Sequence, residues 1–289
     1  MSVGGPRTRD EEIERRPDNG PGDVRAALLE TGQPQRALAM SSSSHPTPLT
    51  DVCLGVVCPM ANEALNAVSF VDAVLSECSR HGLGSVTLFV VVDRVSHDET
   101  RALLEAHQAR QSRLHVVWAP ETRGVADAYV RGYREALAAG SDWILEIDAG
   151  FSHDPSEIGA FLAAMAEGCD CVFGSRFRQG GRNLAPLRRR VVSRSGTVLA
   201  NRLLGTKLSD MTSGYQLFTR AALEAILAKG IRSKGPFFQT EMKAYCRNLR
   251  CAEVPITYDA GSHAVGVRAI GESLVNLGGL FRRRISGDL

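Results

Sequence analysis

Between residues 52 and 174, short apolar segments of strand length alternate with segments that have helical apolar spacing. The strand-like segments are apolar at nearly every position, as expected for strands that are buried on both faces of a sheet. They lie at residues 52–58, 85–92, 114–118, 143–147 and 169–174. Strands that alternate with helices form parallel β-α-β units. The sequence therefore predicts an α/β fold with a mostly parallel sheet flanked by helices.

Signals for the start of a helix occur in two of the segments between these strands. Ser96 and Glu99 have the spacing of a capping box, which predicts a helix from there to about residue 108. Asp154 precedes Pro155 and Glu157, and this order of cap, proline and acid predicts a second helix start. The final segment has the 4-3-4 apolar spacing of an amphipathic helix. Further helices are predicted at residues 63–80, 125–139, 186–204, 221–229, 239–249 and 268–284, with a strand at 251–257.

Residues 1–49 differ from the rest of the chain, because Gly, Pro, Ser and charged residues dominate them. Such a segment cannot bury enough apolar surface to offset its loss of conformational entropy. We predict a disordered tail there, with at most a short helix at 25–38, and one folded domain at 50–289. No apolar segment approaches the roughly 20 residues that cross a bilayer, and the start is not a signal peptide. The seven cysteines lack paired metal-binding spacing, which favours reduced thiols in a cytoplasmic protein.

Polar residues follow three of the predicted strands. Asp148 follows residues 143–147, Asp93 follows 85–92, and the segment 59–63 follows the first strand. In an open α/β sheet, ligands bind beyond these carboxyl ends, so we expect the three segments to cluster. Asp148 offers a hard oxygen ligand that suits Mg²⁺ or Mn²⁺ on a diphosphate. A single aspartate after a strand is more often the cap of a helix or turn.

Nine short segments add to this pattern through their order along the chain. They are residues 58–63 (CPMANE), 91–93 (VVD), 123–128 (RGVADA), 147–155 (IDAGFSHDP), 173–177 (FGSRF), 187–194 (LRRRVVSR), 209–215 (SDMTSGY), 238–242 (FQTEM) and 252–256 (AEVPI). Each segment is weak by itself, but their joint order resembles glycosyltransferase family 2. Within that family, it looks most like the dolichyl/polyprenyl-phosphate mannose synthase branch.

The resemblance implies a GT-A-type, Rossmann-like single domain that ends in the amphipathic helix. It also implies roles for individual residues. The nucleotide sugar would be bound by Pro59, Asn62, Glu63, Asp93, Arg123 and Asp148. A Mg²⁺ or Mn²⁺ ion would be held by Asp148 and Gln239. The acceptor phosphate would be bound by Arg176, Arg189 and Ser193, and the catalytic residues would be Asp148, Arg176 and Arg189.

The chain departs from the family pattern at several positions. Gly150 stands where the second acid of the D-x-D motif belongs, so a ligand of the metal is missing. Water, His153 or Asp154 are candidates to replace it, as is a metal-free arrangement. Arg94-Val95 replaces the usual Asp-Gly, Gly124-Val125-Ala126 replaces Gly-x-Gly, and residues 258–268 carry His263 and Arg268 instead of the family's Arg and Ser-Lys.

The charge pattern favours an anionic acceptor. Residues 176–194 contain seven arginines and no acid, and arginine binds phosphate through two parallel hydrogen bonds. The resemblance implies inverting transfer of a hexosyl group from GDP-mannose or a UDP-hexose to polyprenyl or dolichyl phosphate, and the charge pattern fits this acceptor. An ionised phosphate needs no general base, whereas a hydroxyl acceptor would require one, with Glu241 or Asp127 as candidates.

Two alternative functions stay open. One is a family 2 transferase with a soluble small-molecule or nucleoside acceptor, and the other is a catalytically silent homologue that binds a nucleotide sugar. The basic end of the last helix, Arg282-Arg283-Arg284, suggests peripheral contact with the cytoplasmic face of a membrane. A docked helix with a solvated end explains it equally well. No nucleic-acid partner is expected.

Overall fold

The computed structural model describes residues 47–259 and 267–289. Almost all of the predicted tail, including the segment 25–38, lies outside the described residues, as do His263 and the side chain of Arg268. The described cysteines are free thiols, as the sequence predicts: Cys53, Cys58, Cys78, Cys169, Cys171, Cys246 and Cys251. Across the described parts of the chain, none of the helices has the length and apolar character required to cross a bilayer.

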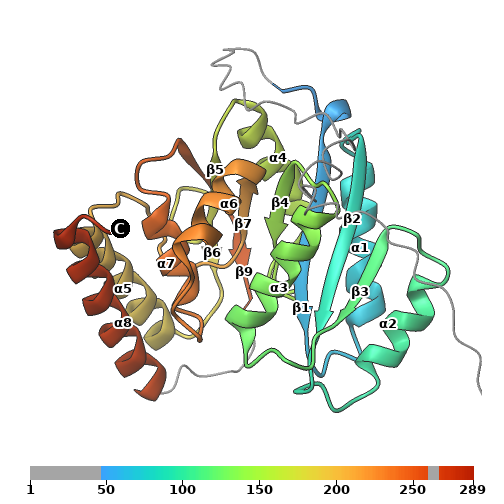
Figure 1. The fold of residues 1–289 in the computed structure, drawn as a ribbon, viewed down its shortest axis with the longest axis horizontal. Coiled ribbons are helices and arrows are strands. Elements are labelled where there is room, and N and C mark those ends of the chain that lie inside the picture. The colour runs from blue at the N-terminus through green and yellow to red at the C-terminus, as the bar shows by residue number, and fades with distance from the viewer. Residues whose placement is uncertain (1–46, 260–266) are drawn as a thin grey trace, which may run out of the picture. The chain divides into compact units, whose positions relative to one another are not determined.

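The centre of the fold is a seven-stranded sheet in the order β3-β2-β1-β4-β7-β5-β8 (Figure 1). All neighbouring pairs are parallel except those of β7, which lies antiparallel between β4 and β5. The mostly parallel prediction is therefore confirmed, while β7 was missed because it contains only four residues and shows no clear period. The strands are β1 Cys53–Met60, β2 Ser85–Val92, β3 Leu114–Trp118, β4 Trp143–Glu146, β5 Cys171–Ser175, β7 Gln216–Thr219 and β8 Cys251–Pro255.

Helices cover both faces of the sheet and bury its apolar side chains in two main clusters. One face carries α1 Ala67–Ser79, α2 Thr100–Gln108 and α4 Ile158–Ala166. The other carries α3 Val125–Ala138, α6 Arg220–Lys229 and α7 Phe238–Tyr245. Beyond α7, α5 Leu187–Leu204 and α8 Val267–Ser286 pack side by side (Figure 1). The short strands β6 Arg182–Asn183 and β9 Thr257–Tyr258 form a separate parallel pair.

The two predicted helix starts have different outcomes. Asp154 accepts a hydrogen bond from the Ser156 amide at 2.9 Å and caps the 3-10 turn Pro155–Glu157 (η2), which leads into α4. A second 3-10 turn, Leu49–Asp51 (η1), precedes β1. The Ser96–Glu99 capping box was wrong, because neither side chain caps α2. Asp98 does so instead, since its Oδ1 accepts the Thr100 amide at 3.0 Å.

Candidate active site

A cavity of about 560 Å³ opens beyond the end of β4, between α5, α7 and α8. It brings together several residues that the sequence singled out as metal or acceptor-phosphate ligands: Asp148, Arg176, Arg189, Ser193 and Gln239. The rest of its lining includes apolar side chains of α5 and α8, among them Val191, Leu199, Ile270, Leu274 and Leu277. The cavity thus combines a polar end with an apolar wall.

Two neighbouring side chains, Tyr129 and His153, contact Asp148. The Tyr129 hydroxyl donates to its Oδ1 at 2.6 Å, and its own backbone N–H donates to Nδ1 of His153 at 3.1 Å. Burial and the negative charge of Asp148 raise the pKa of Tyr129 well above its usual value, so the hydroxyl stays protonated as a donor. Burial lowers the pKa of His153, so its ring is neutral. Its Nε2 lies 3.8 Å from Oδ2 of Asp148 and has no hydrogen-bond partner.

The loop after Asp148 has an unusual backbone. Gly150 has φ +68° and Phe151 has φ +59°. Residues other than glycine rarely adopt this left-handed backbone conformation. The Phe151 ring packs edge-on against Phe70 at 5.1 Å between centroids, which anchors the turn. Strained backbone of this kind persists where the surroundings fix it, and it clusters at functional sites.

A buried acid behind the cavity sets the orientation of Gln239. Glu146 is fully buried on β4 and accepts hydrogen bonds from Nε2 of Gln239 and Nε2 of Gln216, each at 3.1 Å, and from the Tyr133 hydroxyl. Because its amide nitrogen is bound there, the Oε1 of Gln239 is the atom left to serve as a ligand. Burial raises the pKa of Glu146 to about 8, although the bonds from Tyr133 and Gln239 act against this. Glu146 was not among the predicted site residues, and its one signal in the sequence is an acid inside an apolar strand.

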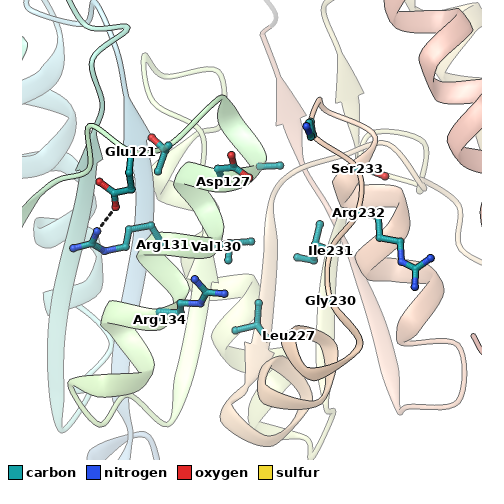
Figure 2. Close-up of a pocket in the computed structure, with 13 residues that line it drawn as sticks. Glu121, Asp127, Val130, Arg131, Arg134, Leu227, Gly230, Ile231, Arg232 and Ser233 are labelled. Atoms are coloured by element: carbon teal, nitrogen blue, oxygen red, sulfur yellow. Dashed lines mark hydrogen bonds and ion pairs between the residues drawn. The ribbon is translucent and has the colours of Figure 1, made fainter.

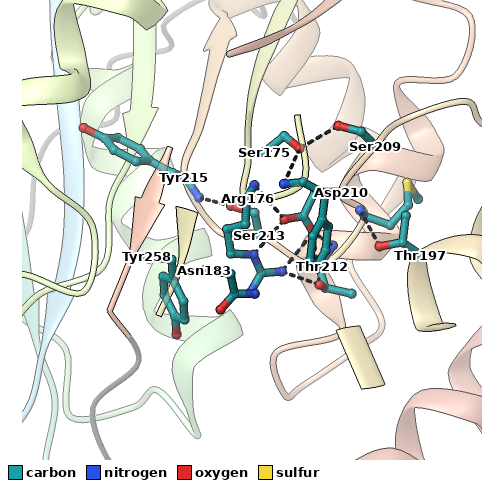
Figure 3. A network of polar contacts seen from close by, with 12 residues as sticks. Ser175, Arg176, Asn183, Thr197, Ser209, Asp210, Thr212, Ser213, Tyr215 and Tyr258 are labelled. Atoms are coloured by element: carbon teal, nitrogen blue, oxygen red, sulfur yellow. Dashed lines mark hydrogen bonds and ion pairs between the residues drawn. The ribbon is translucent and has the colours of Figure 1, made fainter. Parts of the chain in front are cut away.

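A second buried network holds Arg176 (Figure 3). Its guanidinium bonds both carboxylate oxygens of Asp210, at 2.7 and 2.9 Å, and the hydroxyl of Thr212 at 2.5 Å. Lys243 lies beneath, and its Nζ donates to the carbonyls of Asp210 and Ser213 at 2.9 and 2.8 Å. Burial lowers the pKa of Lys243 to about 8, against the effect of Asp210. Part of Arg176's hydrogen-bonding capacity is thus used within the protein, although its side chain still lines the cavity.

Tyr258 stands between the two predicted phosphate-binding arginines. The guanidinium carbons of Arg176 and Arg189 lie 5.2 and 5.6 Å from the centroid of its ring. Arg189 also donates to the Tyr258 hydroxyl at 3.1 Å. Cations favour such positions over aromatic rings. Tyr258 therefore holds two guanidinium groups at one end of the cavity, a role that the sequence did not indicate.

Apart from Asp148, the residues predicted to bind the nucleotide sugar do not line this cavity. Asn62 uses its side chain within the protein, since Nδ2 donates to the Val95 carbonyl and Oδ1 accepts the His97 amide. Asp93 accepts the Val95 amide at 2.9 Å and the Thr122 hydroxyl at 3.2 Å. Pro59 is the last residue but one of β1, Arg123 is exposed, and Glu63 is half-buried beside Gly150. These residues lie at the edge where β1 and β2 end, as the topology predicts.

Neither candidate general base faces the Asp148 cavity. Asp127 lines a different cavity, of about 410 Å³, between α3 and the segment after α6 (Figure 2). Glu241 is 1% exposed, and its carboxylate accepts the amides of Arg232 and Ser233 and the Tyr245 hydroxyl. Among the described residues that line the Asp148 cavity, Asp148 is the only carboxylate and no histidine occurs.

The donor set suits a hard divalent cation only in part. Asp148 and Gln239 present oxygen atoms to one cavity, which is the chemistry that Mg²⁺ and Mn²⁺ prefer. Over residues 47–259 and 267–289, no three His, Cys, Asp or Glu side chains are grouped to hold a metal ion. Neither suggested side-chain replacement for the missing acid lines the cavity. Asp154 caps η2, and Nδ1 of His153 accepts the Asp148 amide, which places the proton of the neutral ring on Nε2. The residues therefore fit such an ion with one protein ligand fewer than the family motif supplies.

A parallel α/β sheet with a carboxylate at the end of a central strand, beside a cationic cavity, is the arrangement of GT-A-type transferases. The profile described as "Glycosyl transferase family 2" matches residues 56–227, more than half of the chain. The chain therefore belongs to glycosyl transferase family 2 and is a glycosyltransferase, as the sequence pattern indicated.

Two relatives and one solved structure illustrate the similarity. An undecaprenyl-phosphate mannosyltransferase of Micrococcus luteus is 34% identical over 65% of this chain and 79% of its own length. A polyprenol monophosphomannose synthase of Mycolicibacterium smegmatis is 35% identical over 70% and 76%. Glucosyl-3-phosphoglycerate synthase from Mycobacterium tuberculosis, solved with UDP, has a TM-score of 0.56 at 17% identity over 81% of this chain and 80% of its own. This last likeness concerns the fold alone.

Proposed function

We propose that this protein transfers a hexosyl group from a nucleoside-diphosphate sugar to a polyprenyl or dolichyl phosphate, with inversion at the anomeric carbon. The observation that carries the proposal is the Asp148 cavity, whose polar end and apolar wall match a phosphate attached to a hydrocarbon chain. Both bacterial relatives are named for phosphorylated polyprenols and mannose. The names support this class of acceptor and favour mannose as the sugar.

The acceptor phosphate fits the end of the cavity where Arg176 and Arg189 flank Tyr258. Arg176 is fixed by Asp210, so it presents its charge without further loss of side-chain freedom. The lipid chain fits the apolar wall between α5 and α8. Each CH₂ group removed from water there contributes about 0.8 kcal/mol.

The chemistry requires few protein groups. A phosphate oxygen of the acceptor attacks the anomeric carbon, the bond from that carbon to the diphosphate breaks, and the nucleoside diphosphate leaves with the bonding electrons. No proton must be removed, which agrees with a cavity whose only described carboxylate is Asp148. Asp148 and Gln239 would hold a Mg²⁺ or Mn²⁺ ion that neutralises the charge of the leaving diphosphate. Tyr129 and Glu146 keep these two side chains in position.

Peripheral contact with the cytoplasmic face of a membrane is part of the proposal. Outside the cavity, α5 exposes Leu187 and Val198 among its arginines, a mixture that suits an anionic lipid surface. The basic end of α8 contributes less than its sequence suggests. Arg283 and Arg284 donate to the Tyr245 hydroxyl and the Leu203 carbonyl, each at 2.7 Å.

The test is a transfer assay on the purified full chain. Labelled GDP-mannose, UDP-glucose and UDP-N-acetylglucosamine are each offered with polyprenyl phosphate or with soluble hydroxyl acceptors. We expect labelled lipid from one donor, released as sugar by mild acid, and much slower labelling with the Asp148→Asn variant. Transfer only to soluble acceptors would overturn the lipid acceptor. Nucleotide binding without transfer to any acceptor would support the catalytically silent homologue instead.

A further inference from the structure

The loop before β7, residues 209–215, is one of the family-like segments for which the sequence predicted no role. Three of its residues line the Asp148 cavity, namely Thr212, Ser213 and Gly214. The first part of the loop holds Arg176, because Asp210 accepts hydrogen bonds from its guanidinium and, at 3.2 Å, from its backbone N–H (Figure 3). The position of this guanidinium in the cavity therefore follows the position of the loop.

The last part of the loop contacts Gln239. A Cβ atom at Gly214 would overlap Nε2 of Gln239 and lie 2.8 Å from its Cδ and 3.2 Å from its Oε1. The backbone of Gly214 lies outside the left-handed region, so its conformation does not require a glycine. The Gln239 amide thus occupies the space that a side chain at position 214 would take, and Glu146 holds the amide there at 3.1 Å.

Helix α7 joins the two parts of this loop. Its Lys243 is 1% exposed, and Nζ donates to the carbonyls of Asp210 and Ser213 at 2.9 and 2.8 Å. A buried ammonium group is unfavourable unless it is hydrogen-bonded, and here both partners belong to the loop. Because α7 also carries Gln239, the helix, the loop and Arg176 form one connected unit.

We propose that residues 210–214 fix the separation between the two reacting ligands, the acceptor phosphate at Arg176 and the donor diphosphate at Gln239. Gly214 and Lys243 are the positioning residues of this loop. The inference rests on the proposed function, which assigns these two ligands to the cavity. Transfer requires the attacking oxygen and the anomeric carbon to lie about 3–3.5 Å apart, and a misplacement of about 1 Å can cost about a hundredfold in rate. A loop that is anchored at both ends keeps this separation.

A double-mutant cycle between positions 214 and 239 tests the role of Gly214. We expect Gly214→Ala to lower kcat about 10- to 100-fold, because the new methyl group displaces the Gln239 amide. Gln239→Ala removes that amide, so adding Gly214→Ala to it should lower kcat less than about twofold further. A glycine that served only the fold of its own loop would give the full loss in both backgrounds.

Urea unfolding gives the same cycle without turnover. Gly214→Ala should lower the unfolding midpoint of the wild type, because displacement of the Gln239 amide takes one hydrogen bond from Glu146, and should leave the midpoint of Gln239→Ala unchanged. Where Gly214→Ala alone does not fold, we expect the double variant to fold. Gly235→Ala is the matched control, since Gly235 lines neither cavity and a Cβ atom there would meet nothing within 4 Å. It should change kcat less than about twofold.

Lys243→Met tests the other positioning residue, because it keeps the length of the side chain but removes both hydrogen bonds to the loop. We expect kcat to fall about tenfold and the KM for polyprenyl phosphate to rise about fivefold, since both ends of the loop are released. Gly214→Ala should leave this KM within about twofold, because Arg176 keeps its partners. The constants are measured at a temperature where circular dichroism shows both variants folded, and unchanged constants in folded Lys243→Met would overturn the role of Lys243.

Failure of this inference is distinguishable from failure of the proposed function. Equal effects of Gly214→Ala in the two backgrounds, on kcat and on the unfolding midpoint, overturn the role of Gly214. Transfer to polyprenyl phosphate by the wild type would then leave the proposed function standing. Conversely, the expected coupling in the unfolding midpoint without transfer to polyprenyl phosphate would support Gly214 as the positioning residue of Gln239 and overturn the lipid acceptor.

Discussion

The cavity that contains Asp148 has two walls of opposite construction. The inner wall and the layer directly behind it contain buried ionisable groups with several partners each: Glu146, behind the cavity, accepts three hydrogen bonds, and Arg176, in its lining, makes three with Asp210 and Thr212. The outer wall consists of α5 and α8, whose cavity-lining side chains include Val191 and Leu274, exposed to 55% and 54%. Hydrogen bonds hold the polar groups of the inner wall in place, whereas the apolar side chains of the outer wall make few specific contacts.

This difference suggests a division of tasks. Buried polar networks fix positions, because leaving any member without its partner is costly. Apolar surface that remains partly exposed gains free energy in proportion to the area covered, with little dependence on geometry. The inner wall would therefore position the reacting phosphates. The outer wall would accept hydrocarbon chains of different lengths.

The sharpest test of this comparison is to remove the negative charge of Asp148 from the inner wall of the cavity. Asp148→Asn should lower the rate of transfer about a hundred- to a thousandfold, because it removes charge where the leaving diphosphate is neutralised. Initial rates at saturating donor measure this. Its stability should stay near that of the wild type, since the Tyr129 hydroxyl can donate to the new amide oxygen. A rate above a tenth of the wild type would contradict the assignment.

The stability of the inner wall is tested at Asp210. Asp210→Ala leaves the buried guanidinium of Arg176 without its partner and should lower the free energy of unfolding by about 3–5 kcal/mol. Urea unfolding measures this change. The control is Glu224→Ala, which breaks the more exposed pair of Glu224 with Arg220 and should cost less than about 1 kcal/mol. Equal losses in the two variants would show that burial gives Asp210 no special importance.

The titration of Glu146 makes the stability of the protein depend on pH. Its pKa in the folded protein is about 8 against an ordinary value of 4.5, so the folded state binds more protons than the unfolded state between these pH values. This contribution to stability is fully present below pH 4.5 and is lost as pH rises through 8. Relative to Glu146→Gln, the wild type should lose up to about 1.4 kcal/mol per pH unit in this window. Urea unfolding at several pH values tests this, and a constant difference would contradict it.

The outer wall should give the smallest effect. Leu274→Ser removes apolar surface from the cavity and should raise the KM for polyprenyl phosphate about fivefold, which corresponds to about 1 kcal/mol. The KM for the donor and the stability should change little. Val275→Ser is the matched control, because Val275 is the adjacent exposed residue of α8 and does not line the cavity. Similar KM values for both variants would argue against lipid binding along this wall.

The elements of the first half of the chain were predictable because each depends on local pattern. The strands at residues 85–92 and 114–118 are found at the predicted positions, since buried parallel strands are apolar throughout. Topology alone placed Asp93 and Asp148 at one edge. The family resemblance, not periodicity, pointed to Gln239, Arg176 and Arg189, and the cavity contains all three.

The missed residues act through contacts between distant segments. Gln239 and Glu146 are separated by 93 positions, and Lys243 and Asp210 by 33. No local pattern encodes such pairs. Asn62 illustrates the opposite limit, because its place in a family segment implied a ligand contact, whereas its amide ties together the loops after β1 and β2. A motif identifies the position, and only the neighbours of the side chain identify its partner.

The place of β7 has a consequence for the order in which the chain folds. β5 is made before β7 but joins the rest of the sheet only through it, because β7 lies between β4 and β5. Until residues 216–219 have emerged from the ribosome and inserted, one edge of β4 has no neighbour. Such pairing between distant segments is slow, and an open strand edge invites association with other chains. We expect the interval between synthesis of β4 and insertion of β7 to be when the nascent chain aggregates most readily and depends most on chaperones.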